Sequence, residues 1–180
     1  MGKNAELAGL FLAQARRLLR ETYLPRIERC VKQLSEEQIW WRANRASNSV
    51  GNLLLHLEGN VRQWIISGLG RTPDRRERDK EFAELGPLPR SVLLGCLRKT
   101  VREACRLLAK LSSRDLTRTY SIQGFHVTGL QAIFHVTEHF SHHVGQIILA
   151  TKMQCGKDLG FTHLPGERTR KSAARSLPPL

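Results

Sequence analysis

Residues 138–147, EHFSHHVGQI, lie inside a longer segment of helical character that runs from about Thr128 to Cys155. Apolar residues in this segment recur every three or four positions, which is the period of one helix face. The residues on that face are Ala132, Val136, Phe140, Ile147 and Ala150. His143 falls on the same face and His139 on its edge. The segment therefore predicts a long amphipathic helix with histidines where it meets the protein core.

Three other segments show the same period, namely residues 7–34, 48–66 and 89–112. Pro25 is expected to kink or divide the first of them, because proline lacks the amide proton of a helical hydrogen bond. Residues 67–88 are charged and are expected to form a loop. Alternating residues around Gly124 predict a small hairpin between Leu116 and Val127. Four long amphipathic helices without a substantial sheet predict an all-α four-helix bundle.

The chain has 180 residues, which suits one domain with a sizeable core. We expect the bundle to occupy residues 1–160 and an irregular basic tail to follow at 161–180. No apolar run approaches the roughly 20 residues of a membrane span, and the first residues lack the apolar segment of a secretory signal. The sequence predicts a soluble, cytoplasmic protein. Its four scattered cysteines form no C-x-x-C pair, which favours reduced thiols over a disulfide framework or a thiolate zinc site.

The formal net charge of +13 raises the question of nucleic-acid binding. The basic residues are spread along the chain, and the segment 71–80 mixes them with Asp74, Glu77 and Asp79. Few aromatic residues lie between them to stack on bases. A solvated basic surface is therefore favoured over a nucleic-acid interface.

Histidines four residues apart on a helix share a face, about 6 Å from each other, and two such imidazoles can bind one divalent metal. His135, His139 and His143 follow this spacing. They cannot all serve one ion, because the outer two are separated by about 12 Å of helix rise. His139 and His143 are nearest the apolar face. On spacing alone, a metal site and a structural role as hydrogen-bonded histidines are equally favoured for this pair.

His56 lies on the polar border of the apolar stripe in segment 48–66, together with Asn52 and Asn60. Taken alone, His56 is better explained as a hydrogen-bonded structural residue. Three neutral imidazoles, however, can bind zinc or nickel and leave positions open for water and substrate. Open positions would make the ion catalytic rather than structural.

Three stretches resemble the DinB/YfiT-like family of metalloenzymes: Asn48–Asn60, Arg76–Phe82 and Glu138–Ile147. The resemblance covers roughly residues 5–160, and the histidine-to-Gly-Gln block is its most specific part. It implies an up-down-down-up four-helix bundle that is commonly dimeric. It also implies a divalent metal held by three histidines, which correspond here to His56, His139 and His143. His135, His142 and the basic tail lie outside the family pattern.

Characterised members of that family include thiol-dependent S-transferases and isomerases that use bacillithiol or mycothiol, and many members have no known activity. The resemblance implies a zinc, nickel or iron ion, a low-molecular-weight thiol and a small-molecule substrate. Asn60 and Gln146 share faces with the ligands and are predicted to bind the cofactor or to hold an imidazole tautomer, with plain structural contacts equally favoured. Arg62, Arg76 and Arg78 are candidates to attract an anionic thiol, with exposed charge as the alternative.

The favoured function is thus a metal-dependent transferase or hydrolase of unknown substrate. A non-catalytic module that uses the metal for stability or sensing is the alternative. A basic nucleic-acid-binding protein is a third and less favoured class.

Overall fold

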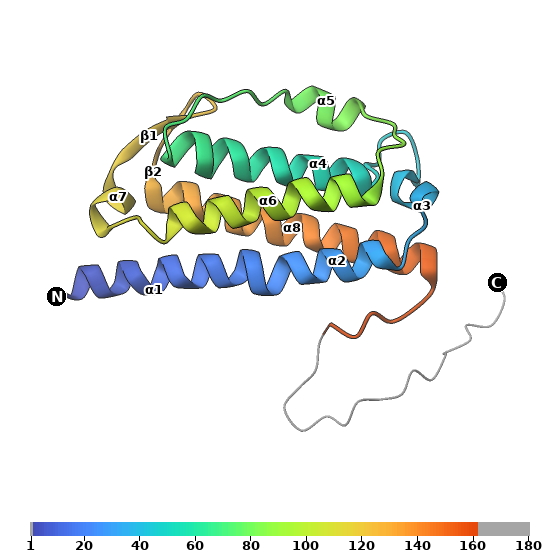
Figure 1. Ribbon diagram of the computed structural model, residues 1–180, viewed down its shortest axis with the longest axis horizontal. Helices are drawn as coiled ribbons and strands as arrows, with labels where there is room; N and C mark the ends of the chain where they lie inside the picture. The colour runs from blue at the N-terminus through green and yellow to red at the C-terminus, as the bar shows by residue number, and fades with distance from the viewer. Residues whose placement is uncertain (1, 162–180) are drawn as a thin grey trace, which may run out of the picture.

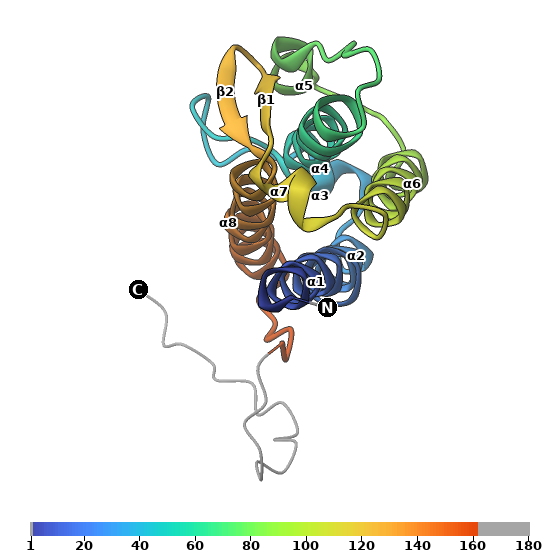
Figure 2. The same cartoon turned by 90° about the vertical axis from the view of Figure 1, so that its left-hand side faces the viewer.

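The computed structural model describes residues 2–161 (Figure 1). Its long helical segments are α1 (Lys3–Arg17), η1 (Leu18–Tyr23), α2 (Leu24–Lys32), α4 (Val50–Val61), η2 (Arg62–Leu69), α6 (Arg90–Leu108) and α8 (Gly129–Cys155). The short elements are α3 (Glu36–Trp40), α5 (Arg78–Ala83), α7 (Ser113–Thr117), β1 (Thr119–Ile122) and β2 (Phe125–Thr128). The long segments form four rods, α1–η1–α2, α4–η2, α6 and α8, which share one apolar core. Figure 2 shows the rods end-on, arranged around this core. The all-α fold class is confirmed.

The direction of each rod follows from the contacts at the α3 end of the bundle. The Arg90 amide, at the start of α6, donates to Glu36 of α3, and Gln154, near the end of α8, donates to the Gln38 carbonyl. At the opposite end, Gly68 of η2 lies against Ile122 of β1. Therefore α4 and α6 run in the same direction, opposite to α1–α2 and to α8 (Figure 1). The connection from η2 to α6 has to cross the length of the bundle, and α5 lies within this crossing.

The first rod continues through Pro25 without a break. The six residues before α2 form the π-helical segment η1, and Pro25 occupies the first turn of α2. A proline cannot donate to the preceding turn and its ring crowds the carbonyl four residues back, so a wider helical turn before it accommodates both effects. Pro25 changes the hydrogen-bond pattern of the helix, while the helix itself continues.

The second rod begins where its sequence predicts. The Ser49 side chain accepts from the Asn52 amide, and the Asn52 side chain accepts from the Ser49 amide, which is a reciprocal cap on the first turn of α4. Beyond Val61 the rod continues as the π-helical segment η2. The prediction of a plain loop at 67–88 is wrong for Arg78–Ala83, which form α5.

The hairpin expected between residues 116 and 127 is confirmed, with β1 and β2 paired antiparallel. Gln123 and Gly124 connect the strands, and both have positive φ angles, 54° and 82°. Two such residues form the turn that matches the twist of a two-stranded hairpin. The hairpin packs against η2 and leads directly into α8.

Helix α8 ends at Cys155, and the next residue, Gly156, has a left-handed φ of 61° that closes the last turn. Of the basic tail expected at 161–180, only Phe161 falls among the described residues, and the rest lies outside them. Within residues 2–161, none of the helices combines the length and the apolar character that crossing a bilayer requires. The four cysteines, all within the described part, are free thiols. Burial raises the pKa of both Cys30 and Cys105.

Candidate metal centre

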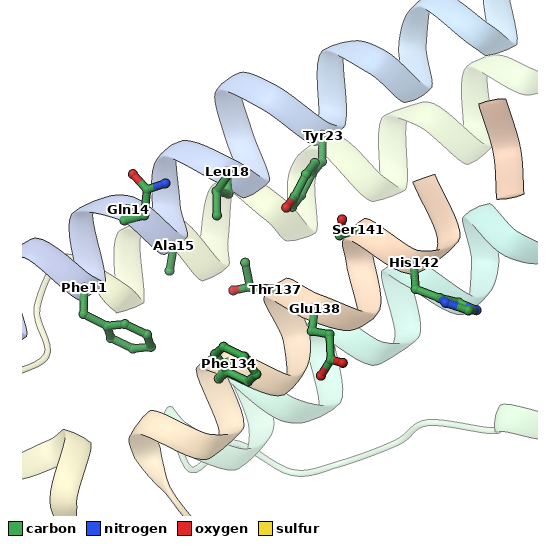
Figure 3. Close-up of a pocket in the computed structure, with 10 residues that line it drawn as sticks. All are labelled: Phe11, Gln14, Ala15, Leu18, Tyr23, Phe134, Thr137, Glu138, Ser141 and His142. Atoms are coloured by element: carbon green, nitrogen blue, oxygen red, sulfur yellow. The ribbon is translucent and has the colours of Figure 1, made fainter. Parts of the chain in front are cut away.

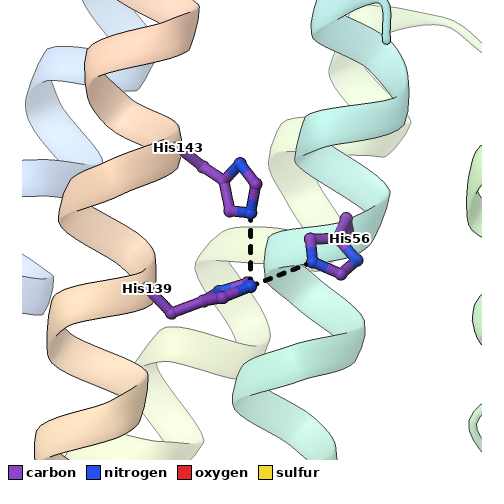
Figure 4. Close-up of side chains that lie close together, drawn as sticks. All are labelled: His56, His139 and His143. Atoms are coloured by element: carbon purple, nitrogen blue, oxygen red, sulfur yellow. Dashed lines mark hydrogen bonds between the residues drawn. The ribbon is translucent and has the colours of Figure 1, made fainter. Parts of the chain in front are cut away.

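Three histidines from two rods meet at one point between α4 and α8. His56 projects from α4, and His139 and His143 project from α8 toward it (Figure 4). The Nε2 atom of His139 lies 3.1 Å from Nε2 of His56 and 3.2 Å from Nε2 of His143. All three ligand atoms lie within 4.8 Å of one another. We call this group the histidine triad.

The spacing of the triad fits the coordination shell of a divalent metal. Imidazole nitrogens bind zinc at about 2.0–2.1 Å, so two of them at a tetrahedral angle are about 3.3 Å apart. The separations of His139 from His56 and from His143, 3.1 and 3.2 Å between Nε2 atoms, are close to this value, and the third pair lies within 4.8 Å. His56 is buried, whereas His139 and His143 are partly exposed. The triad is therefore held by the core but can be reached from solvent.

Glu81 of α5 fixes the proton of His56. Its Oε2 lies 2.9 Å from Nδ1 of His56, and a carboxylate can only accept, so Nδ1 carries the proton and donates it. Nε2 of the neutral ring then presents its lone pair to the triad. A carboxylate that orients a histidine in this way is a common arrangement behind metal ligands.

Arg76 in turn holds Glu81. Its Nε and Nη2 atoms donate to the two carboxylate oxygens at 2.7 and 2.8 Å, and Nη1 donates to Oε1 of Gln63 at 2.9 Å. Arg76 Nη2 also lies 3.0 Å from His56 Nδ1, but a guanidinium can only donate, so this contact is not a hydrogen bond in the tautomer whose Nδ1 donates to Glu81. Burial by itself raises the pKa of Glu81, but hydrogen bonds and charge from Arg76, and then His56, outweigh it and leave the pKa below its ordinary value. Glu81 is therefore ionised and ready to accept from His56.

Helix α5 is attached to α4 by polar contacts and by a close approach at Gly59. The Asn52 side-chain amide donates to the carbonyls of Glu81 and Glu84, and Arg42 donates to the Asn52 side chain and to the Phe82 carbonyl. A Cβ at Gly59 would overlap the Glu81 carboxylate and lie 2.9 Å from Nε of Arg76. The absence of a side chain at Gly59 is what allows Glu81 to reach His56.

Gln146 does for His143 what Glu81 does for His56. Its side-chain oxygen lies 2.7 Å from Nδ1 of His143, which therefore donates, and its nitrogen donates to Nε2 of His142 at 3.1 Å. Burial lowers the pKa of His143, and the hydrogen bond to Gln146 opposes this only in part. His143 is thus a neutral ring with its Nε2 lone pair facing the triad.

His139 occupies the centre of the triad. Burial, followed by the nearby His143, His56 and His135 rings, lowers its pKa to about 3. Its Nε2 faces two nitrogens that both present lone pairs, and one ring proton can satisfy only one of them. A cation would satisfy all three. Nδ1 of His139 is buried and has no hydrogen-bond partner among the described residues.

One helical turn from the triad, Asn60 of α4 faces His135 of α8. Its side-chain nitrogen lies 3.5 Å from Nε2 of His135, and its oxygen is buried without a partner within the described part of the chain. The His135 ring packs 4.1 Å from the Trp64 ring, between centroids, and burial lowers its pKa. Asn60 thus contacts the extra histidine rather than a triad member.

Each of the three candidate arginines contacts other residues of the chain. The Arg76 side chain is 4% exposed and pairs with Glu81, so the alternative that Arg76 is plain exposed charge is wrong, and its attraction of an anionic thiol stays a prediction. Arg62 pairs with Glu58 and also donates to Thr100, and Arg78 stacks over the Phe82 ring at 5.0 Å. Sequence reasoning missed Glu81 as a candidate site residue. The charged stretch 76–82 holds three acids, Glu77, Asp79 and Glu81, and nothing in the local sequence distinguishes Glu81 from the other two.

A large cavity opens on another face of α8, and some of the residues that line it are adjacent in sequence to the triad histidines. It lies between α1–η1 and α8, has a volume of about 530 Å³, and is walled by Phe11, Leu18, Tyr23 and Phe134 (Figure 3). His142 lines its edge, whereas none of the triad residues does. This cavity, called the α1–α8 groove below, is mostly apolar and separate from the histidine triad.

Comparisons with known proteins agree with the fold. The chain is similar to a crystal structure of a DinB-like protein from Bacillus cereus ATCC 10987, with a TM-score of 0.65 and 17% sequence identity over 84% of this chain and 95% of that one. No curated protein matches the chain. The sequence model of a family described as "Protein of unknown function (DUF1572)" matches residues 6–168. The chain therefore has a DinB-like fold and belongs to the DUF1572 family.

Proposed function

We propose that this protein binds one divalent metal ion through His56, His139 and His143 and uses it in a transferase or hydrolase reaction. The observation that carries the proposal is the convergence of three Nε2 atoms while Glu81 and Gln146 hold the protons of two of the rings on Nδ1. Zinc, nickel and iron(II) all accept imidazole ligands.

A divalent ion held by three neutral imidazoles lowers the pKa of a bound water or thiol and so supplies a nucleophile near neutral pH. The residues of the chain prepare the site for it. Burial keeps His139 and His143 neutral, the form that binds metal. Glu81 increases the basicity of His56 and fixes its ring orientation. The partial exposure of His139 and His143 leaves an approach for a small substrate.

We further propose that a low-molecular-weight thiol is the partner at this site, with a small molecule as the second substrate. The support is the resemblance to thiol-dependent S-transferases together with the DinB-like fold. In this proposal Gln146 positions His143, and Asn60 offers its unpartnered oxygen to the bound thiol or substrate.

The first test is the metal content of protein purified without an affinity tag. We expect about one divalent ion per chain, and its loss in His56→Ala and in His143→Ala. His126→Ala is the matched control, because His126 is an exposed histidine on β2. Metal-free protein that stays metal-free after addition of zinc, nickel or iron(II) would contradict the proposal.

The second candidate is a metal that serves only stability or sensing. Cobalt(II) in place of the native ion separates the two, because a thiol that reaches an open position produces a thiolate-to-cobalt absorption band. We expect this band when mercaptoethanol is added to the cobalt-loaded protein. A cobalt spectrum that does not respond to the thiol would favour a closed, structural site.

We propose a homodimer that covers the α1–α8 groove. Its support is apolar surface in and beside this groove: Phe134, which lines it, is 58% exposed, and Leu7 and Leu130, which line the neighbouring cavity, are 68% and 45% exposed. Light scattering of the wild type and of Phe134→Glu tests the proposal. We expect a dimer for the wild type and a monomer for the variant, and a monomeric wild type would rule the dimer out.

A further inference from the structure

A second groove lies between α1–η1 and α6, across the bundle from the histidine triad. In the end-on view, α6 and α1 border one side of the bundle, while α8 and α4 border the opposite side (Figure 2). This groove, called the arginine groove here, has a volume of about 360 Å³. Its size falls within the range of sites that hold small molecules.

Five arginines surround the arginine groove: Arg16, Arg17 and Arg20 from the first rod, and Arg102 and Arg106 from α6. All five are exposed, and none forms an ion pair with any residue in the range 2–161. Glu21 is the one acid among the residues that line the groove. One helical turn from Arg102 the pattern changes, because Arg98 pairs with Glu28 at 2.6 Å. The excess of positive charge is thus local to the groove.

Small side chains leave space between the arginines. Besides the arginines and Glu21, the groove is lined by the buried Cys105 and the exposed Ala13 and Ala109. The Cys105 thiol faces the first rod and lies 3.9 Å from the Arg16 carbonyl. Larger residues at these positions would fill the gap and separate the two rows of arginines. The packing therefore creates a polar hollow with positive charge on both walls.

Like charges held around one hollow repel each other, and an anion between them relieves this repulsion. Guanidinium groups bind phosphate oxygens through paired, charge-assisted hydrogen bonds. Five of them around a space of this size exceed what one phosphate needs. We infer that the arginine groove binds a compact anion with two or more phosphate groups. The groove is short, since it is lined by two helical rods only, and its lining contains no aromatic residue, which favours such a small anion over a nucleic-acid strand.

The test is calorimetric titration of the full chain with tripolyphosphate, compared with inorganic phosphate, at about 50 mM salt, where charge interactions are weakly screened. We expect tripolyphosphate to bind at least about tenfold more tightly than phosphate. In the double variant Arg20→Gln/Arg102→Gln, which removes one arginine from each wall, the affinity for tripolyphosphate should fall at least about tenfold.

Two controls keep this test specific. Arg45→Gln/Arg75→Gln removes the same charge from exposed arginines elsewhere, and it should change the affinity less than about twofold. His139→Ala is the second control, because phosphates also chelate metals and could bind at the triad instead of the groove. If binding is in the groove, this variant should bind tripolyphosphate as tightly as the wild type does. Equal losses in both double variants would mean attraction to net charge and would overturn the inference. Loss of tripolyphosphate affinity in His139→Ala would show that the anion binds at the metal centre, and this would also overturn the inference.

A duplex oligonucleotide of 20 base pairs, as a separate titrant, covers the remaining alternative. If the groove variant loses affinity for the duplex while tripolyphosphate does not bind to the wild type, the groove belongs to a nucleic-acid interface and the inference is wrong. Tripolyphosphate binding that depends on the groove, with no groove-dependent duplex binding, supports it.

Discussion

Arginine side chains occur both near His56 and in the arginine groove, but they are buried and paired in the first region, whereas in the second they are exposed and unpaired among residues 2–161. Near His56, the Arg76 side chain is 4% exposed, pairs with Glu81 and contacts both Gln63 and His56. In the arginine groove, the five arginines are exposed and have no acidic partner within the described residues. One arginine is thus fixed inside the fold, while the others remain available to solvent.

The difference follows from the cost of burying charge. A buried guanidinium must be paired and hydrogen-bonded, so the position of Arg76, Glu81 and His56 is determined before any ligand arrives. An exposed arginine keeps its hydration and its rotamer freedom, and a ligand has to order it. The His56 region is therefore built for precise geometry, and the groove for charge attraction. Substitutions near His56 should therefore change the free energy of unfolding more than substitutions in the arginine groove do.

The largest expected effect comes from Glu81→Gln. This change leaves Arg76 buried without its carboxylate, and breaking a buried pair in this way typically lowers the free energy of unfolding by about 3 kcal/mol. Urea unfolding of metal-free protein measures it. Glu77→Gln, which breaks an exposed pair with Lys80 next to the same helix α5, should cost less than about 1 kcal/mol. Similar losses in both variants would mean that Arg76 is not confined as described.

Gly59→Ala should have the next largest effect. It should lower the free energy of unfolding by about 1–3 kcal/mol, because the added methyl group overlaps the Glu81 carboxylate. Gly95→Ala is the control. It lies inside helix α6, and apart from the adjacent backbone of that helix no atom lies within 4 Å of the new Cβ, so alanine should stabilise the helix by about 0.5–1 kcal/mol. The same unfolding assay applies to both. A stabilised Gly59→Ala variant would show that α5 does not approach α4 this closely.

Gln146→Leu tests whether the exposed end of the triad also depends on fixed geometry. The change removes the acceptor for Nδ1 of His143 while keeping a side chain of similar size. We expect the affinity for zinc to fall about 10- to 100-fold, measured by competition with a chromophoric chelator, with little change in stability. His142→Ala, which removes the other partner of Gln146, should leave the affinity nearly unchanged. An unaltered affinity in Gln146→Leu would remove Gln146 from the site.

These expectations also show which parts of the site could be read from the sequence. The helical period revealed the four rods, and the four-residue spacing of His139 and His143 placed both rings on one side of α8. The pairing with His56 came from a family resemblance, because no local pattern connects residues 83 positions apart.

Glu81 and α5 were not visible in the sequence for a physical reason. Helix α5 has six residues, none of them buried, so it shows no apolar period. It is held by tertiary contacts from Asn52 and Arg42 to backbone carbonyls. The arginine groove was missed for a related reason. Its basic residues are spread along the sequence, and only the antiparallel packing of α1 and α6 brings them together.

The smallest expected effect concerns the stability of the arginine groove. Arg20→Gln/Arg102→Gln should raise the free energy of unfolding by about 0.2–0.5 kcal/mol at low salt, because it removes repulsion between exposed like charges. At about 1 M salt the gain should disappear, since screening then acts over about 3 Å. A loss of stability would mean that these arginines are structural partners, as Arg76 is.

The same variant links stability to binding in the groove. A ligand that binds only the folded chain stabilises it in proportion to its affinity and concentration. With excess tripolyphosphate, the order should therefore reverse, and the wild type should unfold at higher urea than Arg20→Gln/Arg102→Gln. Arg45→Gln/Arg75→Gln should stay close to the wild type under both conditions. If the groove arginines were only solvated surface charge, tripolyphosphate would screen all exposed arginines alike. The wild type would then not become more stable than Arg20→Gln/Arg102→Gln when the anion is added.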